Sequence, residues 1–308
     1  MNDTVAVILA TYNGEKYLKQ QIDSILDQTY KDIKIYIGDD SSKDNTINII
    51  KTYKNLYPDK ITYYQNETNI GFIKNFEKLL QIAKEDYIAF SDQDDVWLPC
   101  KLEEQIKAIK EVEKKDNLPI MCHSDLIMID ENQKIICNSF FSFKKYKLKL
   151  EKDLGHILGP CGVMGNTMMI NKTLKDIIFP FPEKIDFHDY YIAVMCELFG
   201  KRVTFYEPFV LYRIHQDNTS NSKLSIKKKK NTVLPYLERK LDWLNNIKQD
   251  IKQNDLLVIN KFQYYIQNPK KIYYYLELVR YNLVKRDNIY RFKLFFRFLY
   301  NIYWKSNE

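Results

Sequence analysis

Three carboxylates lie within four residues, at Asp92, Asp94 and Asp95, directly after the apolar run at residues 87–90. Carboxylates this close repel one another unless a cation lies among them. The apolar run is typical of a buried strand, and open α/β sheets bind ligands where parallel strands end. The pattern therefore favours a cation site at the end of a strand, although a solvated acidic turn between a strand and a helix would have the same composition.

A second acidic loop follows an earlier strand. Apolar runs alternate along the chain with segments that carry apolar residues at helical spacing. Strands are expected at residues 5–10, 33–37, 61–64 and 87–90, and helices at residues 17–26, 47–53, 72–80 and 102–112. This alternation predicts a parallel α/β sheet. Because Asp39 and Asp40 follow the second strand, we expect both acidic loops at the carboxyl edge of the sheet, where they would form a concave acidic site.

The chain beyond residue 120 is less regular. Strands are expected at residues 120–128, 134–137, 203–205 and 210–214, and helices at residues 191–199, 234–247, 256–266, 272–283 and 290–304. Residues 140–150 are basic and aromatic without a clear period.

Length and charge suggest two parts. The chain has 308 residues, of which 45% are hydrophobic and 28% charged, as in ordinary globular proteins. From residue 223 onward there are 19 Lys and Arg against 7 Asp and Glu, whereas the preceding residues carry 28 against 33. We therefore predict a first domain at residues 1–222 and a basic, aromatic-rich helical extension at residues 223–308, with the four lysines at 227–230 as a hinge.

The five cysteines are odd in number and form no C-x-x-C pair. This usage favours reduced thiols in a cytoplasmic protein. No basic segment precedes the apolar run at residues 5–10, and no stretch of about 18 uninterrupted apolar residues occurs, so neither a signal peptide nor a spanning helix is expected.

Glycine-based phosphate loops are missing from the sequence. Only Gly14 follows the first strand, where a dinucleotide fingerprint would need three glycines, and no G-x-x-x-x-G-K motif occurs. If a nucleotide binds, its phosphates are therefore expected to be held through a metal ion.

Six segments occur in a characteristic order. They are 8–14 (ILATYNG), 37–44 (IGDDSSKD), 69–71 (NIG), 91–97 (SDQDDVW), 188–189 (HD) and 212–215 (YRIH). In this order and spacing the chain resembles the family 2 glycosyltransferases of the GT-A fold, especially the bacterial surface-polysaccharide, rhamnosyltransferase-like branch. The resemblance covers residues 4–220 and implies a mostly parallel central sheet, a nucleotide-diphosphate sugar donor and a divalent cation, Mn²⁺ or Mg²⁺.

The resemblance also assigns the donor site. It implies that Asp92 and Asp94 bind the cation, which also binds the donor diphosphate and acts as a Lewis acid on the departing nucleotide. The nucleotide-binding residues that it implies are Thr11, Tyr12, Asp40, Asn69, Lys74 and Asp92. Asp39 or Asp40 could instead serve only the local turn, and Asp95 could support the cation site or cap the next helix.

The catalytic base implied by the resemblance is Asp189. It would take the proton of the acceptor hydroxyl in a direct displacement, which inverts the sugar carbon. Asp189 could instead cap the helix that it opens. His188 stands where the family more often has an acidic residue, and it could tune Asp189 or help to hold the acceptor. His215 is placed where some relatives contact the metal or the diphosphate, and a neutral imidazole suits Mn²⁺ better than Mg²⁺.

The terminal segment at residues 290–304 is aromatic on most of its circumference, with Arg297, Asn301 and Lys305 as a polar stripe. It is expected either to lie in the headgroup region of an anionic membrane or to form a helical bundle in a homodimer. Nucleic acid is a poorer partner, because the acidic sheet edge would repel phosphate.

We therefore expect a hexosyl- or deoxyhexosyltransferase that builds a bacterial surface polysaccharide, such as capsule or O-antigen, on a glycan or lipid-linked acceptor. Its expected location is cytoplasmic, peripheral on the inner face of the cell membrane. Two alternatives stay open: a sugar-1-phosphate nucleotidyltransferase, for which residues 11–16 supply only one Gly and one Lys, and a non-catalytic lipid- or glycan-binding module.

Overall fold

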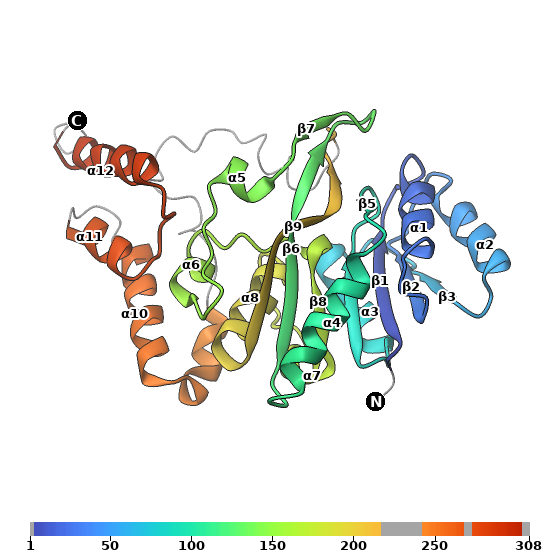
Figure 1. Cartoon of the computed structure of the whole chain (residues 1–308), viewed down its shortest axis with the longest axis horizontal. Helices are drawn as coiled ribbons and strands as arrows, with labels where there is room; N and C mark the ends of the chain where they lie inside the picture. Colours follow the sequence, from blue (N-terminus) through green and yellow to red (C-terminus); the bar gives the residue numbers. More distant parts are fainter. Residues whose placement is uncertain (1–2, 217–241, 268–272, 304–308) are drawn as a thin grey trace. The chain divides into compact units, whose positions relative to one another are not determined.

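The computed structural model describes residues 3–216, 242–267 and 273–303. The chain forms two compact units (Figure 1). The first consists of Met1–Phe140, Val163–Phe181 and Phe187–Ile214, and the second of Phe141–Gly162, Pro182–Asp186 and His215–Glu308. The expected domain boundary at residues 222–223 and the lysines at 227–230 lie outside the described residues.

The first four strands of the first unit are the four expected from the sequence. They are β1 (Val5–Thr11), β2 (Ile33–Asp39), β3 (Ile61–Gln65) and β4 (Tyr87–Ser91). They pair in parallel in the order β3-β2-β1-β4 (Figure 1). Thr11 is level with Asp39, and Leu9 with Ser91, so the loops that follow β1, β2 and β4 leave the sheet at one edge. The prediction of a shared carboxyl edge is confirmed.

Beyond β4 the sheet becomes mixed. It continues through β8 (Met169–Asn171), β6 (Ile120–Ile129), β9 (Lys201–Arg213) and β5 (Val96–Trp97), with β7 (Ile135–Cys137) paired to β6. β8 is antiparallel to β4 and β6, whereas β6 and β9 are parallel. The two short strands expected at 203–205 and 210–214 are one strand, β9, because its irregular pairing with β6 accommodates the residues between them.

Amphipathic helices accompany these strands. They are α1 (Leu18–Leu26), α2 (Thr46–Leu56), α3 (Phe72–Ile82), α4 (Lys101–Glu113), α7 (Lys172–Ile178) and α8 (His188–Phe199). In α1, Leu18, Ile22 and Ile25 are fully buried at helical spacing. α8 is different, since nearly all its residues are buried, including Glu197. A helix with such an apolar circumference belongs to the core, and β1 is buried to the same degree.

The second unit is helical. It contains nearly all of α5 (Phe140–Lys144), followed by α6 (Leu154–Leu158), the 3₁₀ segment η3 (Asp242–Asp250), α10 (Gln253–Gln267), α11 (Tyr273–Arg280) and α12 (Asn288–Tyr303). Gly155 of α6 lies so close to the backbone that a methyl group on it would be 2.9 Å from the carbonyl carbon of Tyr281. Nearby, Asp153 receives two hydrogen bonds of 2.5 and 2.6 Å from the guanidinium of Arg286. The predicted helices at 256–266 and 290–304 are confirmed in their described parts. The helix predicted at 272–283 ends at Arg280, because Asn282 takes a positive φ of 57°, and the described part of the helix predicted at 234–247 belongs to the 3₁₀ segment η3.

Candidate active site

The acidic loop after β4 carries two partly exposed carboxylates, Asp92 and Asp94. Burial, followed by the nearby carboxylates of Asp94 and Asp189, raises the pKa of Asp92 to about 7. Carboxylates affect one another in this way only at short range. The fold thus brings Asp189, from a distant part of the sequence, to the acidic loop.

Asp189 lies in the first turn of α8, one residue after its start at His188. Its Oδ2 accepts a hydrogen bond of 3.3 Å from the backbone N–H of Gly165, and its Oδ1 one of 2.7 Å from the N–H of Tyr190. The N-cap position belongs to Phe187, so the capping alternative for Asp189 does not describe this helix.

His188 is packed among aromatic rings rather than turned toward an open surface. Only 6% of the residue is exposed, and its ring centroid lies 4.3 Å from that of Phe76 and 5.7 Å from that of Phe90. Neither ring nitrogen has a hydrogen-bond partner among the described residues. Burial lowers its pKa, which keeps the imidazole neutral behind Asp189.

Asp95 has a different environment from the other two acidic residues of its loop, because it is fully buried. It accepts hydrogen bonds of 2.5 Å from Asn166 Nδ2 and 3.2 Å from the backbone N–H of Arg213. Burial, followed by the Asp94 and Asp92 carboxylates, raises its pKa well above the ordinary value. It does not cap the next helix, since the N-cap of α4 is Cys100.

The loop after β1 is tied to the acidic loop by one side-chain amide. Gln93 Oε1 accepts a hydrogen bond of 2.8 Å from the backbone N–H of Tyr12, and its Nε2 donates one of 2.9 Å to the Tyr12 carbonyl. Gly14 lies against this amide, with a methyl group at its Cα predicted to fall 2.6 Å from Gln93 Cδ. The ring of Tyr12 is left 46% exposed.

The two aspartates after β2 stabilise loops. Asp39 accepts hydrogen bonds from the Thr11 hydroxyl at 3.1 Å and from Gln65 at 3.0 Å, and it also accepts bonds from the local turn. Asp40 accepts from the backbone N–H groups of Ile70 and Gly71, at 2.9 and 2.8 Å. Both aspartates are buried, so the turn-forming role considered for them is present, and a contact of Asp40 with a nucleotide stays a prediction.

The remaining predicted contacts are on the surface or in the other unit. Asn69 and Lys74 are exposed, and Lys74 Nζ lies 2.7 Å from Glu77 Oε2 on its own helix. His215 is the first residue of the third segment of the second unit. The structure brings Asp92, Asp94 and Asp189 together, whereas the donor roles of Asn69 and Lys74 and the metal role of His215 stay predictions.

Arg213 supports the acidic loop and is the main residue that sequence reasoning missed. Its guanidinium, on a residue only 1% exposed, donates to the Asp94 carbonyl at 2.9 Å, to Gln20 Oε1 at 2.6 Å and to the Glu131 carbonyl at 3.2 Å. It also lies 4.6 Å from the ring centroid of Tyr17. The sequence signals are its place in the 212–215 segment of the family resemblance and an arginine in the apolar run that ends β9, and neither indicates its contacts.

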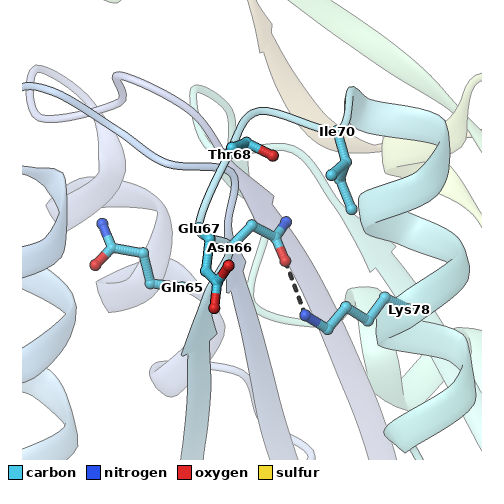
Figure 2. A pocket seen from close by; sticks show the side chains of 6 residues that line it. All are labelled: Gln65, Asn66, Glu67, Thr68, Ile70 and Lys78. Atoms are coloured by element: carbon cyan, nitrogen blue, oxygen red, sulfur yellow. Dashed lines mark hydrogen bonds between the residues drawn. The ribbon is translucent and has the colours of Figure 1, made fainter.

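A hollow of about 380 Å³ lies beside the loop that Asp40 holds. Figure 2 shows the side chains that line it, with Lys78 Nζ donating to Asn66 Oδ1 at 2.8 Å. Asn66 in turn donates to Asp40 Oδ1 at 3.0 Å. The hollow is polar and is not lined by Asp92, Asp94 or Asp189, so it borders the predicted nucleotide loops rather than the carboxylates.

The described residues limit how a metal ion could be held. In the described ranges, His, Cys, Asp and Glu side chains do not form a group of three or more that could hold a metal ion. A cation at Asp92 and Asp94 would therefore need further oxygen ligands from substrate or water.

Within the part of the chain that the structure describes, no helix is both long and apolar enough to span a membrane.

Sequence comparisons identify relatives of known family. The family model for glycosyl transferase family 2 matches residues 6–173. An uncharacterised glycosyltransferase of Methanocaldococcus jannaschii is 35% identical over 248 residues, which cover 78% of this chain and 80% of the relative. The dTDP-rhamnosyl transferase RfbG of Shigella flexneri is 40% identical over 105 residues, or 33% of this chain and 36% of the relative. The Escherichia coli glucosyltransferase WfaP is 28% identical over 222 residues, covering 72% and 81%.

Solved structures share the fold. TarS of S. aureus in complex with UDP gives a TM-score of 0.58 at 17% identity, covering 98% of this chain and 93% of that chain. The mannosyltransferase PcManGT of Pyrobaculum calidifontis gives 0.51 at 14% identity, covering 98% and 87%. The predicted GT-A type α/β fold is thus confirmed. The family model matches more than half of the chain, and a glycosyltransferase relative is 35% identical over 80% of its length. The chain therefore belongs to glycosyl transferase family 2.

Proposed function

We propose that the chain is an inverting, metal-dependent glycosyltransferase. It moves a hexosyl or deoxyhexosyl group from a nucleotide-diphosphate sugar to a glycan or lipid-linked acceptor during bacterial surface polysaccharide synthesis. The observation that carries this proposal is that two consecutive residues, Gly165 and Asn166, hydrogen-bond Asp189 and the acidic loop at Asp95, which puts a candidate base beside a candidate cation site. The names of two relatives support the substrates: RfbG is named a dTDP-rhamnosyl transferase, and the name of WfaP contains UDP-Glc and alpha-D-GlcNAc-diphosphoundecaprenol.

Asp92 and Asp94 fit a divalent cation. Burial and then the Asp94 carboxylate raise the pKa of Asp92, and a cation between the two carboxylates would relieve their repulsion. Mg²⁺ and Mn²⁺ both accept carboxylate oxygens and keep positions for substrate phosphate. His215 stays a proposed further ligand, although in the described residues it does not form a metal-binding group of three with Asp92 and Asp94. When bound, the cation supplies positive charge that offsets the charge developing on the departing nucleotide diphosphate. A structural neighbour was solved with GDP-Man and Mn²⁺.

Asp189 is the proposed base. Hydrogen bonds from the backbone N–H groups of Gly165 and Tyr190 hold its carboxylate in one orientation, in which it can accept the proton of an acceptor hydroxyl. The neighbouring carboxylates of Asp92 and Asp94 are assigned to the cation. The sugar carbon is therefore attacked by the acceptor itself, in a single displacement that inverts its configuration.

The proposed donor contacts lie on the loops after β1, β2 and β3. The exposed side chain of Tyr12, which follows Thr11, offers a surface on which the nucleobase of the donor can stack. Asp40 holds the loop that carries Asn69, and Lys74 follows on α3. TarS has been solved with UDP and with UDP-GlcNAc, which supports a nucleotide-diphosphate sugar in this fold.

The C-terminal extension, proposed as residues 223–308, is the proposed membrane-binding part. On α12 the side chains of Ile289, Phe292 and Phe296 are 59%, 64% and 51% exposed, with exposed Lys293 at the same helical spacing. An apolar helix face with a lysine suits the headgroup region of an anionic membrane. Peripheral attachment to the cytoplasmic face of the membrane would bring the enzyme to a lipid-linked acceptor; a homodimer is the alternative use of this face.

Vesicle sedimentation separates these two uses. The full chain is mixed with neutral phosphatidylcholine vesicles or with vesicles that also contain phosphatidylglycerol. We expect sedimentation with the anionic vesicles and its loss in Phe292→Ser/Phe296→Ser. A wild-type chain that stays in the supernatant, but whose dimer dissociates in the double variant, would contradict membrane binding.

The catalytic proposal is tested with the full chain, Mn²⁺ and a panel of UDP-, dTDP- and GDP-sugars. We expect one donor to release nucleoside diphosphate, and product analysis by NMR to show an inverted anomeric configuration. Asp189→Asn should reduce turnover by about 10²–10⁴-fold with donor affinity nearly unchanged, because it removes the proton acceptor but not the binding groups.

Asp176→Asn is the matched control, since it makes the same chemical change at an exposed position of α7 and should keep full activity. A product with retained configuration would contradict the single displacement. An Asp189→Asn variant that keeps more than about a tenth of wild-type turnover would contradict its role as base.

A further inference from the structure

The 3₁₀ turn η1 (Gly165–Thr167) connects the two halves of the candidate active site. The backbone N–H of Gly165 donates to Asp189 Oδ2 at 3.3 Å. The next residue, Asn166, donates from Nδ2 to Asp95 Oδ2 at 2.5 Å. Two consecutive residues therefore hold the proposed base on one side and the acidic loop on the other.

The turn itself is held firmly in the core. Asn166 is 2% exposed and Thr167 is fully buried. The Thr167 carbonyl accepts a hydrogen bond of 2.7 Å from Gln105 Nε2, and Gln105 Oε1 accepts one of 3.1 Å from the buried ammonium of Lys101. The residue after the turn, Met168, accepts from the backbone N–H of Phe90 in β4 at 3.1 Å. The turn is thus attached to the strand from which the acidic loop emerges.

There is little free space between the turn and the first residues of α8, His188 and Asp189. A methyl group on Gly165 would lie 3.1 Å from Nε2 of His188 and 3.6 Å from Cβ of Asp189. His188 in turn packs against Phe76 and Phe90. A shift of the turn therefore moves the first residues of α8, because no gap separates them.

We propose that Asn166 is a positioning residue that fixes the distance between the acidic loop and Asp189. It does not contact substrate; its amide fixes the acidic loop through Asp95, while the preceding N–H orients the Asp189 carboxylate. This inference rests on the proposed function, since it assumes that Asp94 holds the cation and Asp189 accepts the proton. Displacement of a reacting group by about 1 Å can reduce turnover about 10²-fold, so such a residue affects kcat without touching the donor.

The test combines a deletion with an exchange of partners. Asn166→Ala removes the amide donor, and Asp95→Asn/Asn166→Asp restores a donor–acceptor pair with the two groups exchanged. For Asn166→Ala we expect kcat to fall about 10–100-fold, with the KM for donor and the dissociation constant of Mn²⁺-loaded nucleoside diphosphate within about threefold of wild type. The exchange variant should recover at least about a tenth of the lost kcat. Asn117→Ala, at an exposed position, is the matched control.

A second readout does not depend on sugar transfer. Backbone hydrogen exchange at residues 164–168 should be faster in Asn166→Ala. It should return toward the wild-type rate in the double variant Asp95→Asn/Asn166→Asp. If the wild-type chain transfers no sugar, the proposed function fails, and the exchange rates still report whether Asn166 holds the turn.

Three results would overturn the inference. The first is a kcat of Asn166→Ala within twofold of wild type. The second is an equal loss of kcat and donor affinity, which a loop that merely misfolds would give. The third is unchanged hydrogen exchange at residues 164–168.

Discussion

The amide of Gln93 is expected to be the main protection of the Tyr12 backbone N–H, since the N–H groups of Asn13 and Gly14 bond to Ser42 and Thr46 instead. It makes two hydrogen bonds with the Tyr12 backbone, of 2.8 and 2.9 Å, and it lies against Gly14. Gln93→Ala removes both bonds. Gly14→Ala should displace the same amide, because a methyl group there would lie 2.6 Å from Gln93 Cδ. The two substitutions therefore break one contact by different routes.

The size of the effect follows from the two bonds. A neutral hydrogen bond contributes about 0.5–1.5 kcal/mol, so the loss of both should favour local opening of the loop by about 1–3 kcal/mol. At about 1.4 kcal/mol for each factor of ten, the amide of Tyr12 should exchange about 5- to 150-fold faster in Gln93→Ala. Since Gly14→Ala breaks the same contact, the double variant should exchange no faster than the faster single variant.

Hydrogen–deuterium exchange of a peptide that includes Tyr12 measures this directly. Gln253→Ala, at an exposed position of α10, is the matched control and should leave the peptide unchanged. A Tyr12 amide that exchanges at the wild-type rate in Gln93→Ala would refute the reasoning. Additive effects of the two substitutions would also refute it, because they would mean that Gly14 acts independently of Gln93.

Three further substitutions test the supports of the fold. Arg213→Lys should lower the free energy of unfolding, measured by urea titration, by about 2–4 kcal/mol. One ammonium cannot replace a buried guanidinium that donates to several acceptors. A loss below about 0.5 kcal/mol would contradict this prediction. Burial lowers the pKa of Lys101 from 10.5 to about 7, so between these values the unfolded chain binds a proton that the folded chain lacks, and stability rises with pH. Lys101→Met should abolish that rise in thermal unfolding between pH 7 and 9, whereas an equal rise in both proteins would be contrary evidence. Gly159→Ala should lower the free energy of unfolding by about 1–3 kcal/mol, because its methyl group would lie 2.8 Å from the carbonyl carbon of Leu283. An unchanged thermal unfolding temperature would show that the backbone moves apart without loss of stability.

The first half of the sheet could be predicted because each strand is a continuous apolar run that ends in polar residues. The runs at 5–10, 33–37, 61–64 and 87–90 became β1 to β4, and the acidic residues after them lie at one edge because parallel strands end together. The proximity of Asp189 to Asp92 was predicted only through the family resemblance. No spacing within the sequence relates α8 to the loop after β4.

The supporting residues could not be predicted, because they act through contacts between distant segments. Arg213 would be expected on the surface from its type, but it is buried where the acidic loop, α1 and the turn after β6 meet. Gln93 is the polar residue between two aspartates, with no sign in sequence that it pairs with the β1 loop. Asp95 looks equivalent to Asp94, and only burial separates their roles. Family membership leaves the nucleotidyltransferase alternative without support.

Binding of Mn²⁺ in the presence of UDP, dTDP or GDP, followed by electron paramagnetic resonance, tests the central claim most directly. The claim is that Asp92 and Asp94 hold a cation beside Asp189. We predict that wild type binds the ion, that Asp92→Asn and Asp94→Asn each weaken binding by at least about tenfold, and that Asp176→Asn leaves it unchanged. Equally tight Mn²⁺ binding by wild type and by Asp92→Asn/Asp94→Asn would contradict the account.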